Sequence, residues 1–142
     1  MEIVSIAVSR TAGVPKRPVP KAYLAANHGI KGDAHAGPWH RQVSFLPAES
    51  IETLRGQGFD VNFGSFAENI ATRGIDWSQI AVGSWLSLGS SAVVEITQKG
   101  KTCHAKCSIY SMTGDCIMPK QGIFARVVKT GAIRTGDVIR FQ

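Results

Sequence analysis

The sequence predicts a mostly-β, barrel-like fold with a few short helices. Three observations support this prediction: short segments rich in Val, Ile and Phe recur along the chain, glycine turns separate them, and only one segment has the pattern of a longer helix. The 15 glycines are dispersed over 142 residues, and no shift in composition marks a domain boundary. Because a chain of this length buries roughly 70% of its unfolded surface in one core, we expect residues 1–142 to form a single domain.

The first forty residues are predicted to form one strand and two irregular connections. Residues 2–8 are β-branched at four positions and alternate weakly, which suits a strand near the edge of a sheet. Residues 10–20 contain three prolines and three basic side chains, and such a segment fits neither a helix interior nor a central strand. We therefore expect an extended surface connection there. A loop with special backbone angles is expected over residues 27–40, where Gly29, Gly32, Gly37 and Pro38 cluster.

The middle of the chain is predicted to contain the main helix between strands. Residues 42–46 are a short strand candidate. Pro47 then suits the first turn of a helix in which Ile51 and Leu54 share one face, and Gly56 or Gly58 marks its end. The later strand candidates are short, apolar and separated by glycine turns; they cover residues 66–71, 84–88, 92–97, 123–129 and 137–141.

The distribution of charge narrows the functional classes. The chain has 16 Lys and Arg and 10 Asp and Glu, so its formal net charge is +6. Residues 1–98 hold eight charges of each sign, whereas residues 99–142 hold eight basic residues and only Asp115 and Asp137. A basic protein commonly binds nucleic acid. Here, however, Trp39, Trp77 and Trp85 are scattered rather than interleaved with basic residues, so no nucleic-acid partner is expected.

Neither a membrane span nor a signal peptide is predicted. No apolar run approaches the roughly 20 residues that cross a bilayer, and the first residues lack a basic segment before a long apolar one. We therefore expect a cytoplasmic protein without a membrane partner. In a reducing cytosol, the three cysteines are expected to be free thiols, metal ligands or reactive groups rather than a disulfide framework.

All three cysteines lie in the basic last third of the chain, and they are the candidates for a catalytic group: Cys103, Cys107 and Cys116. Lys101, His104 and Lys106 are adjacent in sequence, and such cations lower the pKa of a thiol by stabilising its reactive thiolate form. The alternative is that the three cysteines are small buried apolar residues. Zinc is not expected, because the cysteine spacing departs from that of paired zinc knuckles.

The glycine-rich segment 29–44 is a second candidate site. Its candidate ligand-binding residues are Gly32, Asp33, His35, Gly37, Arg41 and Ser44. Glycines allow a ligand to approach the backbone, and a guanidinium offers paired donors to phosphate or carboxylate, so the backbone amides and Arg41 would cradle an anion. The alternative is a surface loop whose Asp and His side chains cap turns. A third candidate is the pair Glu68 and Asn69, which must either be satisfied within an apolar core or face a ligand.

Several motifs follow one another from about residue 19 to the end of the chain. They are GDAHAG at 32–37, RQVS at 41–44, FAENI at 66–70, KTCH at 101–104 with Cys107, CIMP at 116–119, and GIFARV at 122–127 through the Gly-Asp at 136–137. Together they closely resemble the MOSC family, whose domains are related to the C-terminal part of molybdenum-cofactor sulfurases. The sequence resembles the compact, stand-alone bacterial type, which implies a β-rich, barrel-like fold.

The resemblance also implies a functional cysteine. That cysteine would either carry sulfane sulfur received from a pyridoxal-phosphate-dependent cysteine desulfurase or ligate the molybdenum of the molybdenum cofactor. Cys107 and Cys103 match the family's cysteine motif, which is one residue longer here, so Cys107 (or Cys103) would be the metal ligand and Cys116 ranks third. Arg41 and Arg126 would supply positive charge. No lysine matches a Schiff-base context, so no pyridoxal phosphate is expected on this chain itself.

The leading hypothesis is therefore a MOSC-domain protein of molybdenum cofactor metabolism. One alternative is a binding module without turnover that hands a pterin or oxyanion to another enzyme. Another is a molybdenum-dependent reductase of N-hydroxylated compounds, as in the larger relatives. The expected partners are a cysteine desulfurase, molybdenum enzymes or proteins of cofactor biosynthesis, together with a small anionic ligand.

Overall fold

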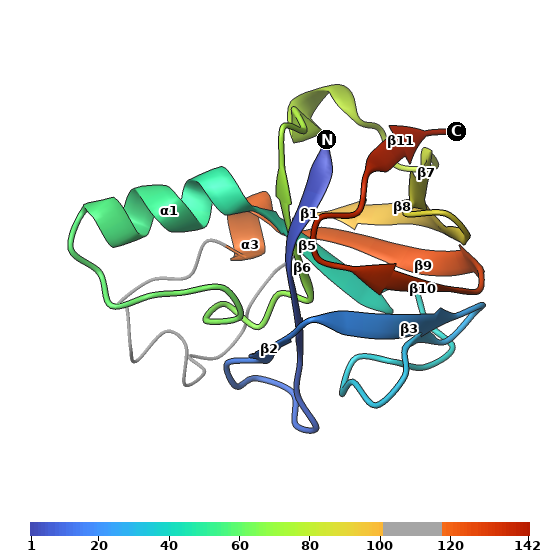
Figure 1. Ribbon diagram of the computed structural model, residues 1–142, viewed down its shortest axis with the longest axis horizontal. Coiled ribbons are helices and arrows are strands. Elements are labelled where there is room, and N and C mark those ends of the chain that lie inside the picture. The colour runs from blue at the N-terminus through green and yellow to red at the C-terminus, as the bar shows by residue number, and fades with distance from the viewer. Residues whose placement is uncertain (101–117) are drawn as a thin grey trace.

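Strands dominate the structure, and the predicted mostly-β class is confirmed (Figure 1). The structure is a computed structural model that describes residues 1–100 and 118–142. Its strands are β1 (Glu2–Val8), β2 (Arg17–Val19), β3 (Lys21–Ala25), β4 (Gly29–Ile30), β5 (Val43–Pro47), β6 (Ile70–Arg73), β7 (Trp85–Leu88), β8 (Ala92–Lys99), β9 (Ile123–Lys129), β10 (Gly131–Arg134) and β11 (Ile139–Phe141). The described helices are α1 (Ala48–Gly56), the 3-10 turn η1 (Trp77–Gln79) and α3 (Met118–Gln121).

Eight strands form one mixed sheet in the order β11-β7-β8-β9-β5-β6-β1-β2, and β10, β3 and β4 form a second sheet. The large sheet curls until β1 meets the segment that precedes β11, at the opposite end of the strand order. There the Ile3 amide donates to the Asp137 carbonyl (2.9 Å), and the Gly136 amide donates to the Ile3 carbonyl (2.7 Å). The fold is therefore barrel-like, although β2 extends past this contact and the described strands do not pair in one closed ring.

Two apolar clusters hold the fold together. The larger contains side chains from nearly every strand of the curled sheet, among them the fully buried Ile6, Phe45 and Val94. In the smaller, Ile51 of α1 packs with Leu46 of β5 and other apolar side chains of the sheet and the connection before β6. Because each such side chain contributes about 1.5–3 kcal/mol when fully buried, the second cluster fixes α1 against the sheet.

The main helix lies close to its predicted position. Pro47 is its N-cap residue, Ile51 is buried as expected, and Leu54 is partly buried against the same cluster. The helix ends at Gly56, and Gly58 takes the left-handed conformation (φ +97°) that is common just beyond a helix end. Within the described parts of the chain, no helix is long and apolar enough to cross a membrane.

The structure differs from the sequence-based expectations in two connections. Residues 10–20 are not only a surface connection, because β2 lies there as an edge strand, where prolines are tolerated, and the preceding Lys16 is buried. The strand expected over 66–71 begins only at Ile70, because the residues before it form a turn in which Ala67 takes a left-handed φ of +61°. The short strands β3, β4 and β10 were not predicted, since they lack a clear period of two.

Candidate functional site

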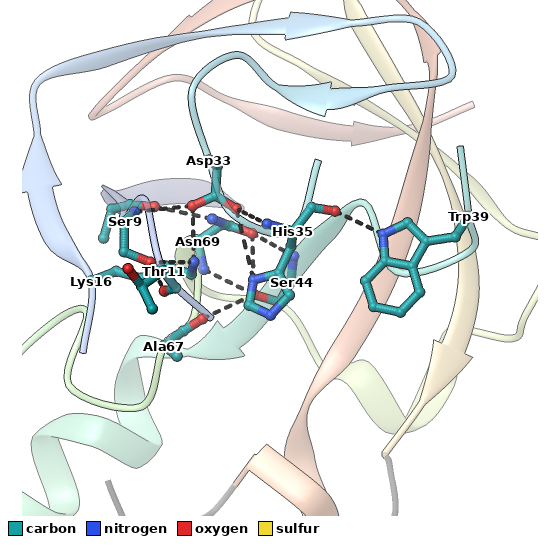
Figure 2. Close-up of polar contacts among 10 residues, drawn as sticks. Ser9, Thr11, Lys16, Asp33, His35, Trp39, Ser44, Ala67 and Asn69 are labelled. Carbon is teal, nitrogen blue, oxygen red and sulfur yellow. Dashed lines mark hydrogen bonds and ion pairs between the residues drawn. The ribbon is translucent and has the colours of Figure 1, made fainter. Parts of the chain in front are cut away.

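A buried ion pair joins the connection after β1 to the glycine-rich loop (Figure 2). Lys16 Nζ donates to Asp33 Oδ1 and to Ser9 Oγ, each at 2.9 Å, and the side chains of Lys16 and Asp33 are both 0% exposed. Burial alone would raise the pKa of Asp33. The neighbouring His35, together with the hydrogen bond and the charge of Lys16, outweighs burial and holds this pKa below its usual value. Asp33 is therefore an ionised anchor of the loop.

His35 lies beside Asp33, and one of its ring nitrogens has no hydrogen-bond partner. Its backbone amide donates to Asp33 Oδ2 (3.0 Å), whereas its ring Nδ1 lies 3.7 Å from the same oxygen and is buried without a hydrogen-bond partner. The ring stacks on Trp39 with 6.4 Å between centroids, and Trp39 Nε1 donates to the His35 carbonyl (2.7 Å). The imidazole is thus held between a carboxylate and an indole, and a small rotation would let Nδ1–H bond to Asp33.

Arg41 lies at the other end of the glycine-rich loop. Its guanidinium carbon is 4.7 Å from the centroid of the Trp39 ring and 5.7 Å from that of the Phe124 ring. Its Nε is buried without a hydrogen-bond partner, and Arg41 makes no ion pair with any residue that the structure describes. A buried donor without a partner costs about 1–3 kcal/mol. This cationic group is therefore suited to an acceptor supplied by a ligand.

Part of the backbone in the predicted anion cradle is already hydrogen-bonded within the protein. Each amide from residue 33 to residue 37 already donates within the protein: Asp33 to the Ile30 carbonyl, Ala34 to Ser9, His35 to the Asp33 side chain, Ala36 to the Asp33 carbonyl and Gly37 to His28. Gly32 and Gly37 instead serve conformation, with φ of +85° and +152°. These five amides are therefore not open to a ligand, and in the predicted cradle Arg41 keeps an open side-chain donor.

Ser44 and Asn69, predicted in separate motifs, meet where β5, β6 and β1 come together (Figure 2). The Ser44 amide donates to Asn69 Oδ1 (3.0 Å), and Asn69 Nδ2 donates to the Ala7 carbonyl (3.1 Å). The Asn69 amide in turn donates to Ser44 Oγ (3.0 Å). Both side chains are buried and satisfied by protein groups, which is the structural alternative stated for Asn69.

Glu68 closes the turn that precedes β6. Its Oε2 accepts from the Gly64 amide (2.5 Å) and its Oε1 from the Phe66 amide (3.1 Å), so the carboxylate takes the place of missing strand hydrogen bonds. Burial raises the pKa of Glu68 to about 7, although these backbone amides act in the opposite direction. Glu68 thus stabilises a turn and titrates near neutral pH.

The candidate cysteines Cys103, Cys107 and Cys116 lie outside the described residues, but the chain on either side of them is described. Gln98 bridges the glycine-rich loop and the last described residue before that segment: its Oε1 lies 2.9 Å from His40 Nε2, and its Nε2 donates to the Gly100 carbonyl (2.7 Å). The Gly100 amide donates to the Gly122 carbonyl (2.6 Å), which ties both flanks together. His40 and Arg41 are therefore placed at the root of the cysteine-containing segment.

Comparison with known proteins identifies the family. A family model described as the MOSC domain matches residues 32–140. This chain belongs to the MOSC domain family. The resemblance in sequence motifs is thereby confirmed, and the family relates the chain to proteins of the molybdenum cofactor. No curated protein sequence matches it significantly.

Solved structures share the fold of this MOSC domain. The YUAD protein from Bacillus subtilis matches with a TM-score of 0.79 at 19% identity, covering 97% of this chain and 93% of that one. YiiM from Geobacillus stearothermophilus matches with a TM-score of 0.76 at 20% identity, covering 99% of this chain and 74% of that one. YiiM from Escherichia coli matches with a TM-score of 0.70 at 17% identity, covering 100% and 70%. At these identities the similarity concerns the fold.

Two other arginines, Arg126 in the GIFARV motif and Arg73 shortly after the FAENI motif, are already paired. Arg126 Nη2 lies 2.6 Å from Glu95 Oε1 across the β8–β9 pair, so its charge is compensated within the sheet. Arg73 binds both carboxylate oxygens of Glu52, at 2.8 and 3.1 Å. The structure therefore does not add Arg126 to the open cationic group at Arg41. Within the described residues, no cluster of three or more His, Asp and Glu side chains could hold a metal ion.

Lys16 is the site residue that the sequence analysis missed. It was counted among the basic residues of a surface connection, yet its side chain is fully buried. Two signals could have indicated its role. It lies in a segment without acidic residues, and Asp33 stands alone as the carboxylate of the glycine-rich loop, where a buried carboxylate needs a cation.

Proposed function

We propose that this MOSC domain acts in molybdenum cofactor metabolism through a cysteine of the segment 101–117, which carries sulfane sulfur or ligates the cofactor's molybdenum. The observation that carries this proposal is the position of His40 and Arg41 beside the described flanks of that segment. An open guanidinium there supports a thiolate or persulfide, because a nearby cation stabilises the anionic form of sulfur. The family membership supports the cofactor class.

The residues present fit an anionic cofactor. Arg41 offers a buried donor without a partner, and a guanidinium suits the oxyanions of phosphate or molybdate. The described His, Asp and Glu side chains form no metal cluster, so a protein ligand to molybdenum would come from Cys107 or Cys103, with Cys116 as the third candidate. The cofactor, when bound, supplies a redox-active metal. The role of this protein would be to hold the anionic groups of the cofactor and to exclude water from them.

Sulfur transfer would proceed without net oxidation. The thiolate of one cysteine attacks the outer sulfur of a donor persulfide, a new S–S bond forms, and the bond between the donor's two sulfurs breaks. The donor leaves as a thiolate that takes up a proton from water, and this chain then holds the persulfide. A cysteine desulfurase is the class of partner that supplies such a donor, and a molybdenum enzyme or a cofactor-biosynthesis protein would accept the sulfur.

Anaerobic purification tests the proposal directly. Intact mass spectrometry and elemental analysis of the whole chain are expected to show a mass increase of one sulfur atom, or stoichiometric molybdenum. Cys107→Ser or Cys103→Ser is expected to abolish that signal, whereas Cys116→Ser keeps it. Neither sulfur adduct nor molybdenum in any preparation, including protein incubated with a cysteine desulfurase and cysteine, would overturn the proposal. Stoichiometric zinc would do so as well.

A binding module without turnover is the second candidate, and the open Nε of Arg41 favours it equally, since it needs no cysteine chemistry. Titration with molybdate separates the two functions. A binding module retains molybdate affinity in both Cys107→Ser and Cys103→Ser and loses it in Arg41→Gln. A sulfur carrier loses transfer in the critical cysteine variant whatever its molybdate affinity.

A further inference from the structure

A basic stretch precedes the region that the MOSC family model matches. Residues 8–32 contain five Lys and Arg and no Asp or Glu, although residues 1–98 as a whole carry equal numbers of both signs. Lys16, one of the five, is neutralised by Asp33 in the interior. Arg10 and Arg17 are exposed, and neither makes an ion pair or a side-chain hydrogen bond with any residue that the structure describes. Their positive charge is therefore uncompensated.

These two arginines line the same pocket. It has a volume of about 370 Å³ and is lined by Val8, Ser9, Arg10, Pro15, Arg17 and Gly32. Val8 and Arg17 are directly opposite in the antiparallel β1–β2 pair, and Arg10 follows Val8 by two residues. Opposite residues in such a pair have Cβ atoms about 5 Å apart. The lining thus combines apolar side chains with two guanidiniums, one from the β1 side and one from the β2 side, and no acidic side chain lines the pocket.

Ser9, which lines the pocket, is held in place by the buried ion pair. Ser9 Oγ accepts from Lys16 Nζ and donates to the Thr11 carbonyl (2.9 Å). The Ser9 amide donates to Asp33 Oδ1 (3.1 Å), and its carbonyl accepts from the Ala34 amide (2.8 Å). Because every polar group of Ser9 is already bonded, ligand recognition falls to the two arginines. Because Ser9 is already held in place, less entropy is lost when a ligand binds.

We propose that this pocket binds a small phosphorylated molecule, with Arg10 and Arg17 on its phosphate and Val8 and Pro15 against an apolar part. A guanidinium fork matches phosphate oxygens, and the volume lies within the range of about 300–1,000 Å³ that is typical of small-molecule sites. The arginines precede residue 32, where the family match begins, so the pocket does not rest on the cysteine-dependent function. Gly32 connects the pocket to the glycine-rich loop.

Two-dimensional NMR of the full chain, titrated with inorganic phosphate and with phenyl phosphate, tests this site. We expect saturable shifts of the Arg10 and Arg17 Nε–H signals and of the Ser9 and Gly32 amides. Phenyl phosphate is expected to bind at least about threefold more tightly than phosphate, because its ring buries apolar surface. Arg10→Gln and Arg17→Gln should each weaken binding at least about fivefold, since each removes charge-assisted hydrogen bonds. Arg140→Gln, on the exposed face of β11, is the matched control and should leave the affinity unchanged.

Two results would overturn this assignment. One is non-saturating shifts that spread over exposed basic residues, Arg140 included. The other is unchanged affinity in folded Arg10→Gln and Arg17→Gln proteins, with folding checked by circular dichroism. Cys107→Ser is expected to bind phenyl phosphate like the wild type. Wild-type protein that acquires neither sulfur nor molybdenum but binds phenyl phosphate would therefore count only against the function proposed above.

Discussion

Lys16→Met removes one half of a buried ion pair and leaves the other charge without its cation. Both side chains are 0% exposed, so the Asp33 carboxylate would keep only the amides of Ser9 and His35 as donors. Removing one partner of a buried pair costs about 3–5 kcal/mol. Because a domain is stable by only about 5–15 kcal/mol, we expect a large loss. At about 2–4 °C per kcal/mol, the melting temperature falls by roughly 6–20 °C.

The stability loss of Lys16→Met should also depend on pH. In the wild type, the folded-state pKa of Asp33 lies below its usual value, so its stabilisation is present above about pH 4 and is lost as pH falls through the folded-state pKa. In Lys16→Met, the hydrogen bond and the charge of Lys16 are lost while the carboxyl group stays buried, so the Asp33 pKa rises relative to the wild type. The variant therefore has less stabilisation to lose as pH falls, and its deficit relative to the wild type is largest near neutral pH. The difference between the two proteins therefore narrows on acidification.

Urea denaturation followed by circular dichroism, at pH 7 and at pH 5, measures both effects. Lys21→Met is the control, because Lys21 is exposed on β3 and its loss should change stability by less than about 0.5 kcal/mol. The double variant Lys16→Met with Asp33→Asn should lose less stability than the two single variants lose in sum, by at least about 1 kcal/mol. A Lys16→Met loss below about 1 kcal/mol at pH 7, or strict additivity, would refute the reasoning.

Three further expectations concern other parts of the site. Burial raises the pKa of Glu68 to about 7. The free energy of unfolding of the wild type should therefore fall by about 3 kcal/mol as pH rises from about 4.3, the usual pKa of a glutamate, to 7. Glu68→Gln should abolish this pH dependence in urea denaturation, and an unchanged pH dependence contradicts the prediction. Asn69→Ala should lose about 2–4 kcal/mol in the same assay, because it leaves two buried backbone groups unpaired; a loss below about 1 kcal/mol counts against this role. Arg41→Gln should slow iodoacetamide labelling of the fastest cysteine at least about threefold relative to Arg140→Gln, as read by peptide mass spectrometry. Equal labelling rates argue against a cationic environment for the thiol.

The elements that were predicted well are those whose pattern is local. The helix over 48–56 begins after a proline and ends at a glycine, and both signals act within one turn. The strand expected over 123–129 matches β9, because its apolar run lies between Gly122 and Gly131. The strand expected over 66–71 failed at its first half for an equally physical reason. Glu68 binds two backbone amides of its own segment, which favours a turn over a ladder.

The residues of the candidate site could be predicted from the sequence, but the residues to which they bond could not. The sequence motifs contain both Ser44 and Asn69, yet that these two bond each other depends on the parallel β5–β6 pairing, which no local pattern reveals. Lys16 was missed for the same reason: burial of a lysine depends on a carboxylate 17 residues away. Tertiary contacts decide which polar residues anchor the site and which remain open to a ligand.

The net charge of the chain differs from the charge that a ligand can use. Arg73 and Arg126 are neutralised by Glu52 and Glu95, whereas Arg41 has no acidic partner among the described residues. Lys99, next to Gly100, donates to the carbonyls of Trp77 and Ile80, and these neutral groups do not compensate its positive charge. Among the described groups, Arg41, Lys99 and Lys120 contribute positive charge beside the two flanks of the cysteine-containing segment. Because exposed charges are screened beyond about 10 Å at 0.1 M salt, added salt should weaken an anionic ligand that relies on Lys99 more than one that contacts the buried Nε of Arg41.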